Sequence, residues 1–184
     1  SGAIKWFENR LSKNKKTLNH HVTPVLSLGA WFAHSVDVDQ DGNLDILTTT
    51  VHESDTVVWY ENVLDTNKMW IPHIMTENSD FAKSAIAVDL DGDTDIDIAY
   101  PSQNNCIEWK EKTNSTKWHT HYIDNVEDGT SFVIHSDIDR DGDHDILSAS
   151  GFKDKIVWHE NLLNEGSGWL THNVTTSAND VDCI

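Results

Sequence analysis

A block of aspartates around a glycine occurs three times in this chain, as DVDQDGNLDIL, VDLDGDTDIDI and DIDRDGDHDIL. The three glycines, Gly42, Gly92 and Gly142, are 50 residues apart each time. Three other features recur at the same step: an apolar stretch before the block, a segment with a tryptophan after it, and a W-x-x-H element. A fixed period of this kind indicates one structural unit used repeatedly, and it limits the fold to repeat architectures.

The repeated segments have the pattern of short β-strands. In VVWYEN, IEWKE and IVWHEN, residues two apart lie on the same face of a strand, so each tryptophan shares its face with an apolar residue. A further copy, IKWFEN, opens the chain. Together with W-x-x-H and the apolar runs on either side of the acidic block, this gives four strands per unit. No stretch has an apolar period of 3.6 residues, so helix is nearly absent.

Four-stranded units that repeat every 40 to 50 residues or so are typical of β-propeller blades. We therefore predict an all-β chain of antiparallel blades that is part of, or assembles into, a roughly seven-bladed propeller. The predicted units are a half blade at 1–28, blades at 29–78, 79–127 and 128–176, and the start of another blade at 177–184. Three blades do not close a ring. Two alternatives stay open, a fragment of a longer propeller and a homo-oligomer in which two chains complete one ring.

The spacing of the carboxylates predicts a site for a hard cation. Side chains at positions 1, 3 and 5 of a tight loop converge on one point when a glycine at position 6 takes a positive φ. Zinc would need histidine or cysteine in the set, so calcium is the predicted ion. The predicted ligands are Asp37, Asp39, Asp41, Asn43 and Asp45; Asp89, Asp91, Asp93 and Asp95; and Asp137, Asp139, Asp141, Asp143 and Asp145.

Aligned on their glycines, the three loops are not equivalent. The first and third have aspartate at positions 1, 3, 5 and 9, and position 7 would contribute through its backbone. The second has Ala87 at position 1, and it has Asp97 where the other loops have Leu47 and Leu147. We therefore predict two strong calcium sites and a weaker one in the second loop.

The combination of D-x-D-x-D-G-x-x-D, W-[YFH]-E-N and W-x-x-H resembles the FG-GAP/VCBS repeats of integrin-α-like β-propellers, over essentially the whole chain. This resemblance implies calcium in the loop between the first two strands of each blade. It also implies an extracellular or cell-surface, non-enzymatic module of the lectin or cell-adhesion kind, with a glycan or a protein as its ligand. A propeller part of a polysaccharide lyase or hydrolase, and a purely structural scaffold, are the alternatives.

The charge of the chain narrows the range of partners. The net charge of −18 disfavours nucleic acid as a partner, because its phosphates need clustered Lys and Arg.

No apolar run approaches the roughly 18 residues of a membrane helix, so membrane insertion is not expected. We find no set of nucleophile, base and orienting residue, so the chain is not expected to be an enzyme.

Residues that recur once per blade are predicted to be structural. The tryptophans Trp6, Trp59, Trp109 and Trp158 are expected in the core between blades, and His73, His121 and His172 in a repeated hydrogen bond. Residues that do not recur are the better candidates for ligand binding, namely Trp31, His52, Tyr100, His144 and Phe152. The sequence does not decide whether Cys106 pairs with Cys183, nor whether the N-x-[ST] sequences at Asn114 and Asn173 are glycosylated.

Overall fold

The computed structural model describes residues 4–9, 18–22, 29–50, 55–63, 70–77, 79, 82–102, 106–114, 117–123, 129–163 and 168–178. In these ranges the chain forms three four-stranded antiparallel sheets and one two-stranded sheet, which confirms the predicted all-β blades. The described residues include no helix long and apolar enough to cross a membrane.

Each four-stranded sheet is a simple meander in which every strand pairs with the next one along the chain. Blade 1 consists of β3 (Ala30–Val36), β4 (Asp45–Thr50), β5 (Val57–Asn62) and β6 (Trp70–Thr76). Blade 2 consists of β7 (Ile86–Val88), β8 (Asp97–Ser102), β9 (Cys106–Asn114) and β10 (Lys117–Ile123). Blade 3 consists of β11 (Thr130–Ser136), β12 (Asp145–Ser150), β13 (Lys155–Leu162) and β14 (Gly168–Thr175).

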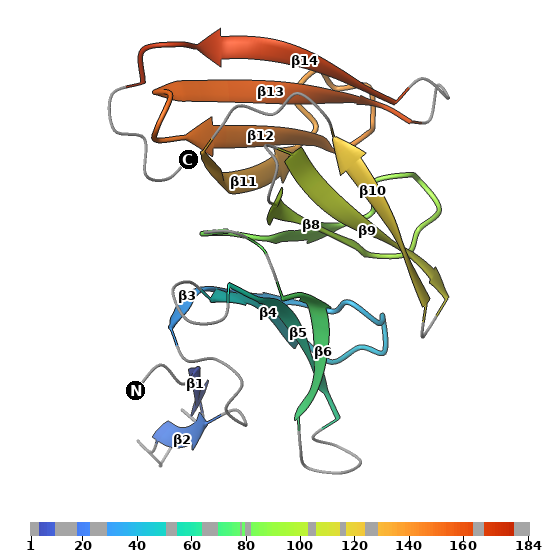
Figure 1. The fold of residues 1–184 in the computed structure, drawn as a ribbon. Coiled ribbons are helices and arrows are strands. Elements are labelled where there is room, and N and C mark those ends of the chain that lie inside the picture. The colour runs from blue at the N-terminus through green and yellow to red at the C-terminus, as the bar shows by residue number, and fades with distance from the viewer. Residues whose placement is uncertain are drawn as a thin grey trace.

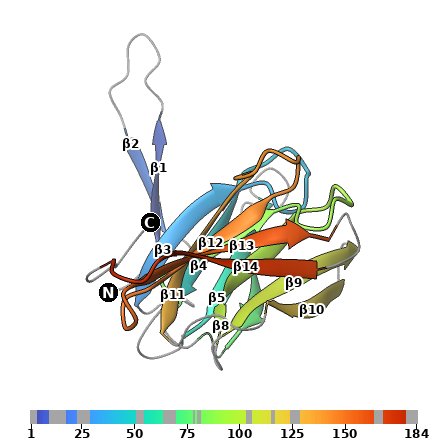
Figure 2. The ribbon, with the colours of Figure 1, turned by 90° about the horizontal axis from the view of Figure 1, so that it is seen from above.

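The three blades lie side by side in chain order, with blade 2 between the other two (Figure 1). Before them come β1 (Lys5–Asn9) and β2 (Leu18–Val22), which pair with each other in a separate two-stranded sheet. Figure 2 shows this pair projecting away from the blades. The described residues therefore form a two-stranded sheet followed along the chain by three four-stranded blades.

Two of the repeated tryptophans fill the core between blades. Trp59 is 2% exposed and belongs to a cluster that includes Ile98 and Tyr100 of blade 2. Trp109 is 3% exposed and lies in the next cluster, with Val133 and Ile146 of blade 3. The predicted role is thus confirmed for Trp59 and Trp109. Trp158 is half-buried in blade 3, and the side chain of Trp6 lies outside the described residues.

The repeated histidines make the same two contacts in each blade. Each imidazole stacks on the tryptophan of the neighbouring strand, with ring centroids 4.2, 4.3 and 4.4 Å apart in blades 1, 2 and 3. Its Nε2 also lies 2.7, 2.5 and 2.6 Å from a glutamate Oε2. The three Trp–His–Glu units are Trp59, His73 and Glu61; Trp109, His121 and Glu111; and Trp158, His172 and Glu160. The predicted structural hydrogen bond of these histidines is confirmed.

A fully buried histidine on β13 predicts a loss of stability in acid. His159 on β13 is fully buried, with Nε2 2.9 Å from the Ser148 hydroxyl, and burial lowers its pKa to about 4. In the unfolded chain its pKa returns to about 6.5, so acid protonates the unfolded state first. The stability that neutral His159 supplies is present above pH 6.5 or so and is lost as the pH falls towards 4. Between pH 7 and pH 4.5 we expect a loss of about 2 to 3 kcal/mol from this residue.

Urea unfolding of the metal-free protein at both pH values measures this loss, with His159→Gln as the comparison. The variant keeps a polar side chain that does not titrate in this range. Its free energy of unfolding should fall by about 2 to 3 kcal/mol less than that of the natural chain over the same pH interval. Equal losses in the two proteins would show that His159 does not carry the effect.

Candidate metal centres

The three acidic loops join the first two strands of each blade, and one aspartate ties each loop down. In blade 1 the Asp45 carboxylate accepts hydrogen bonds from the backbone N–H groups of Val38 (3.0 Å) and Asn62 (2.8 Å). In blade 3 Asp145 accepts the same pair from Ile138 and Asn161, both at 2.9 Å. Each acceptor is buried and is the first residue of its blade's second strand. This aspartate therefore fixes both ends of the loop.

In blade 2 the residue in this role is Asp97, and this corrects the alignment on the glycines. Asp97 accepts hydrogen bonds from the backbone N–H groups of Leu90 (3.0 Å) and Lys112 (2.9 Å). Strand pairing agrees, because Asp97 is opposite Val88 as Asp45 is opposite Val36. Ala87 lies in β7 with its side chain in the core between blades, so the prediction that it occupies position 1 is wrong. The second loop has aspartate at all five odd positions, namely Asp89, Asp91, Asp93, Asp95 and Asp97.

The glycine of loop 2 occupies a different position from those of loops 1 and 3, because two positions of the loop need a positive φ. In every blade positions 4 and 6 have left-handed backbone. The residues are Gln40 (61°) and Gly42 (93°); Gly92 (79°) and Thr94 (79°); and Arg140 (68°) and Gly142 (103°). Loops 1 and 3 put glycine at position 6, whereas loop 2 puts it at position 4. The backbone is the same in all three loops, so aligning them on glycine shifts the second by two residues.

Thr94 is the most strained of the three non-glycine residues at positive φ in these loops, because its side chain alone is β-branched. A β-branched side chain at positive φ costs about 1 to 2 kcal/mol relative to glycine, which takes this conformation freely. Since glycine also loses more entropy on folding, we expect Thr94→Gly to raise the free energy of unfolding by about 1 kcal/mol net. Thr94→Ala retains a Cβ and should gain less. Urea unfolding of both variants tests this, and a Thr94→Gly protein no more stable than Thr94→Ala would contradict it.

In each loop three side chains bring carboxylate oxygens together, at positions 1, 3 and 5 in loops 1 and 3 and at positions 1, 3 and 9 in loop 2. In loop 1 the oxygens of Asp37, Asp39 and Asp41 lie within 4.8 Å of one another. Asp137, Asp139 and Asp141 form the same group in loop 3, and Asp89, Asp91 and Asp97 form one in loop 2. The donors are oxygens only, which fits a hard cation such as calcium. In loop 3 Asp137 Oδ1 is buried without a hydrogen-bond partner among the described residues, as expected of a ligand atom.

Burial and mutual repulsion make these loops costly to charge without a cation. Burial raises the pKa of Asp39, and the nearby charge of Asp45 raises it further. The pKa of Asp91 is raised mainly by burial as well. Burial raises the pKa of Asp97 to about 7, against the opposing effect of the hydrogen bonds from Lys112 and Leu90. A bound cation would offset both costs, which is the electrostatic argument for a metal here.

Loops 1 and 2 are each also linked to the next blade, a feature that the sequence interpretation missed. The residue three places after the blade tryptophan reaches the backbone carbonyl at position 2 of the preceding loop. Lys112 Nζ donates to the Val38 carbonyl at 2.8 Å, and Asn161 Nδ2 donates to the Leu90 carbonyl at 2.7 Å. The only sequence signal for these links was the asparagine that recurs in W-x-E-N, and the sequence alone assigns it no contact. Loop geometry and contact between blades are thus coupled.

The candidate ligand-binding residues lie in different environments. Trp31 is 56% exposed, with Lys83 Nζ 5.7 Å from its ring centroid, and Phe152 is 88% exposed. His144 is half-buried, with its Nδ1 3.4 Å from that of His135. The structure does not bring these residues together at one described site.

The two remaining candidates for ligand binding, Tyr100 and His52, add no residue to those above that the structure describes as exposed. Tyr100 is fully buried and its hydroxyl donates to Glu108 Oε1 at 2.8 Å, so its ring offers no surface to a ligand. His52 and Cys183 lie outside the described residues, so the role of the first and the pairing of the second with Cys106 stay predictions. Asn114 and Asn173 are exposed at the surface.

Comparison with known proteins agrees with the repeat. Residues 37–100, which run from the first acidic loop into β8, match the FG-GAP-like repeat family. No curated protein and no solved structure matches the chain. Residues 37–100 are therefore an FG-GAP-like repeat within a chain of β-propeller blades.

Proposed function

We propose that the chain is a calcium-stabilised β-propeller module and that each of its three blades holds one ion. The observation that carries this proposal is the recurrence of one loop framework, with its converging carboxylates, in all three blades. FG-GAP-like repeats are propeller modules of the adhesion type, and this supports the same assignment.

The residues of each loop have separate tasks in this proposal. Aspartates at positions 1, 3 and 5 face the ion in loops 1 and 3. In loop 2 the three that face it are Asp89, Asp91 and Asp97, so Asp97 has two tasks. Asp45, Asp97 and Asp145 hold the loop closed through backbone N–H groups. The calcium would supply positive charge that offsets the repulsion among carboxylates. Because loop 2 has the complete set, we propose three comparable sites in place of two strong sites and a weaker one.

An extracellular or cell-surface location is part of this proposal, and it fits the affinity class of extracellular calcium modules. Several ligands in loops 1 and 3 are exposed, and exposed loops of extracellular modules bind calcium with a Kd of about 10⁻⁴ to 10⁻³ M. Sites of this affinity fill only where free calcium is millimolar, as it is outside the cell. The calcium is therefore structural in this proposal, and it does not act as a signal.

Recognition of a glycan is the binding function that the surface supports best. Trp31 presents an exposed indole with the Lys83 ammonium close to it, and Phe152 presents an almost fully exposed ring. Aromatic faces of this kind stack on sugar rings, and the cation adds a polar contact. In this proposal the chain binds and does not catalyse.

A glycan array in calcium and in EDTA tests this function, with Trp31→Ala and Phe152→Ala as variants. We expect binding in calcium that is weakened in EDTA and in at least one of the variants. An assay for unsaturated or reducing-sugar products runs alongside. Product formation would instead indicate a lyase or hydrolase, and the absence of any glycan binding in calcium would leave a protein ligand or a structural scaffold.

A further inference from the structure

We propose that Glu111, His119 and His121 form a second kind of metal site, which binds a divalent transition metal such as Zn²⁺. The site lies on the last two strands of blade 2, β9 and β10, and shares no ligand with the acidic loops. It goes beyond the calcium proposal and does not depend on it.

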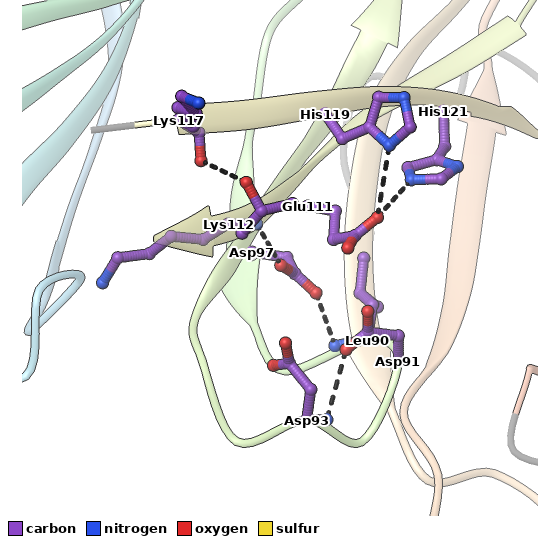
Figure 3. A network of polar contacts seen from close by, with 10 residues as sticks. Leu90, Asp91, Asp93, Asp97, Glu111, Lys112, Lys117, His119 and His121 are labelled. Atoms are coloured by element: carbon purple, nitrogen blue, oxygen red, sulfur yellow. Dashed lines mark hydrogen bonds and ion pairs between the residues drawn. The ribbon is translucent and has the colours of Figure 1, made fainter. Parts of the chain in front are cut away.

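The β-sheet places the three side chains on one face. His119 and His121 are two residues apart on β10, and Glu111 is directly opposite His119 on β9. Figure 3 shows both imidazole rings beside the Glu111 carboxylate. Glu111 Oε2 lies 2.5 Å from His121 Nε2 and 3.9 Å from His119 Nδ1. One ligand atom from each residue lies within 4.8 Å of the other two.

The donor set selects the class of metal. Two imidazoles and a carboxylate are a set that Zn²⁺ takes in sites with an open fourth position, whereas calcium prefers oxygens alone. Tetrahedral ligands about 2.0 to 2.2 Å from an ion lie roughly 3.3 Å from one another. The ion would therefore replace the hydrogen bond between Glu111 and His121 and draw His119 inward. His119 is 72% exposed, so its side chain is free to make this movement.

Two of the three ligands are already held in place. The His121 ring stacks on Trp109 at an interplanar angle of 18°, and Glu111 is 23% exposed beside it. Asp91 of the neighbouring acidic loop is close enough for its charge to interact with that of Glu111. The local field thus favours a cation, and a metal needs to order only His119.

The other two blades separate this site from the common structural contact. All three blades have the Glu–His hydrogen bond, in which glutamate and histidine belong to the Trp–His–Glu unit. At the place of His119, opposite the glutamate, blade 1 has Ile71 and blade 3 has Leu170. The second imidazole is therefore not needed to build a blade. Its presence in blade 2 turns a structural pair into a three-donor cluster.

Titration with Co²⁺ in excess calcium, followed by calorimetry and visible absorption, tests the site with a metal that reports its own ligands. Calcium fills the acidic loops, and it does not compete well for imidazole. We expect one Co²⁺ whose binding is weakened at least tenfold or so in His119→Leu, a change that copies blade 3 and should fold normally. Zn²⁺ should displace the Co²⁺ and abolish the visible band. Equal Co²⁺ affinity in the two proteins, or no Co²⁺ binding by the natural chain, would overturn the proposal.

A variant that creates a second metal site provides a test that does not depend on a loss of binding. Ile71→His gives blade 1 the same three donors, together with Glu61 and His73. The stoichiometry of Co²⁺ should rise from one to two per chain. An unchanged stoichiometry in a folded Ile71→His protein would contradict the claim that these three donors suffice. The readout is unaffected if the acidic loops prove not to bind calcium, so the two proposals can fail separately.

Discussion

Transfer of the chain from EDTA to about 10 mM calcium is expected to raise its free energy of unfolding by about 4 to 8 kcal/mol. A ligand that binds only the folded state stabilises it by RT ln(1 + [L]/Kd). For a Kd of about 10⁻⁴ to 10⁻³ M this is roughly 1.4 to 2.7 kcal/mol per site, and the three blades together give the total. Thermal and urea unfolding measure the gain. Magnesium is the control and should stabilise much less, because it demands stricter octahedral geometry than these loops offer.

Matched variants show whether the three loops contribute equally. Position 3 has the same hydrogen bond in every blade, because Asp39, Asp91 and Asp139 each accept the backbone N–H at position 5. Asp39→Asn, Asp91→Asn and Asp139→Asn should therefore each remove about a third of the calcium-dependent gain. A distinctly smaller effect of Asp91→Asn would support the weaker second site predicted from the glycine alignment. Unfolding curves that coincide in calcium and EDTA would contradict calcium binding altogether.

The strands and the core could be predicted from the sequence because their signal is local. Alternation around Trp59 and Trp109 fixes which face of the strand is apolar, and the repeat shows that this face meets another blade. The structural role of the repeated histidines could be predicted for the same reason. A residue that recurs in every blade serves something that every blade needs, here the stacking of His73 on Trp59 and its contact with Glu61.

Alignment on the glycines gives the wrong register for the second loop, because two differences in segment length compensate each other along the chain. The acidic loop of blade 1 begins at Asp37 and that of blade 2 at Asp89, which is 52 residues later. The segment between β8 and β9 (103–105) is shorter than the one between β4 and β5 (51–56), so the tryptophans keep the 50-residue step. One signal did point to the right register. The glycine alignment puts Asp97 at the place of Leu47, which is fully buried, and an unpaired charge there would be costly.

The links between blades could not be predicted, because they join residues far apart in the chain. Lys112 and Val38 are 74 residues apart, and Asn161 and Leu90 are 71 apart. No local pattern specifies which carbonyl a lysine or an asparagine will reach.

The corrected register makes its own prediction, which separates Asp97 from Asp95. Asp97→Ala would leave the buried N–H groups of Leu90 and Lys112 without an acceptor, and each such loss costs about 1 to 3 kcal/mol. We expect Asp97→Ala to lower the free energy of unfolding by about 3 kcal/mol even in EDTA, where no metal contributes. Asp95→Ala should cost less than about 1 kcal/mol, because the hydrogen bond from the Asp95 backbone N–H to Asp93 does not need its side chain.

Asp45→Ala is the matched control for this comparison in blade 1. Its carboxylate accepts the same two backbone bonds and also one from Trp59 Nε1 at 2.9 Å, so its removal should cost at least as much as that of Asp97. Urea unfolding of the three variants in EDTA gives the order Asp45→Ala, Asp97→Ala, Asp95→Ala from most to least destabilised. The glycine alignment predicts that Asp95 and Asp97 exchange places in this order. A larger loss for Asp95→Ala would therefore return Ala87 to position 1 and the second loop to an incomplete site.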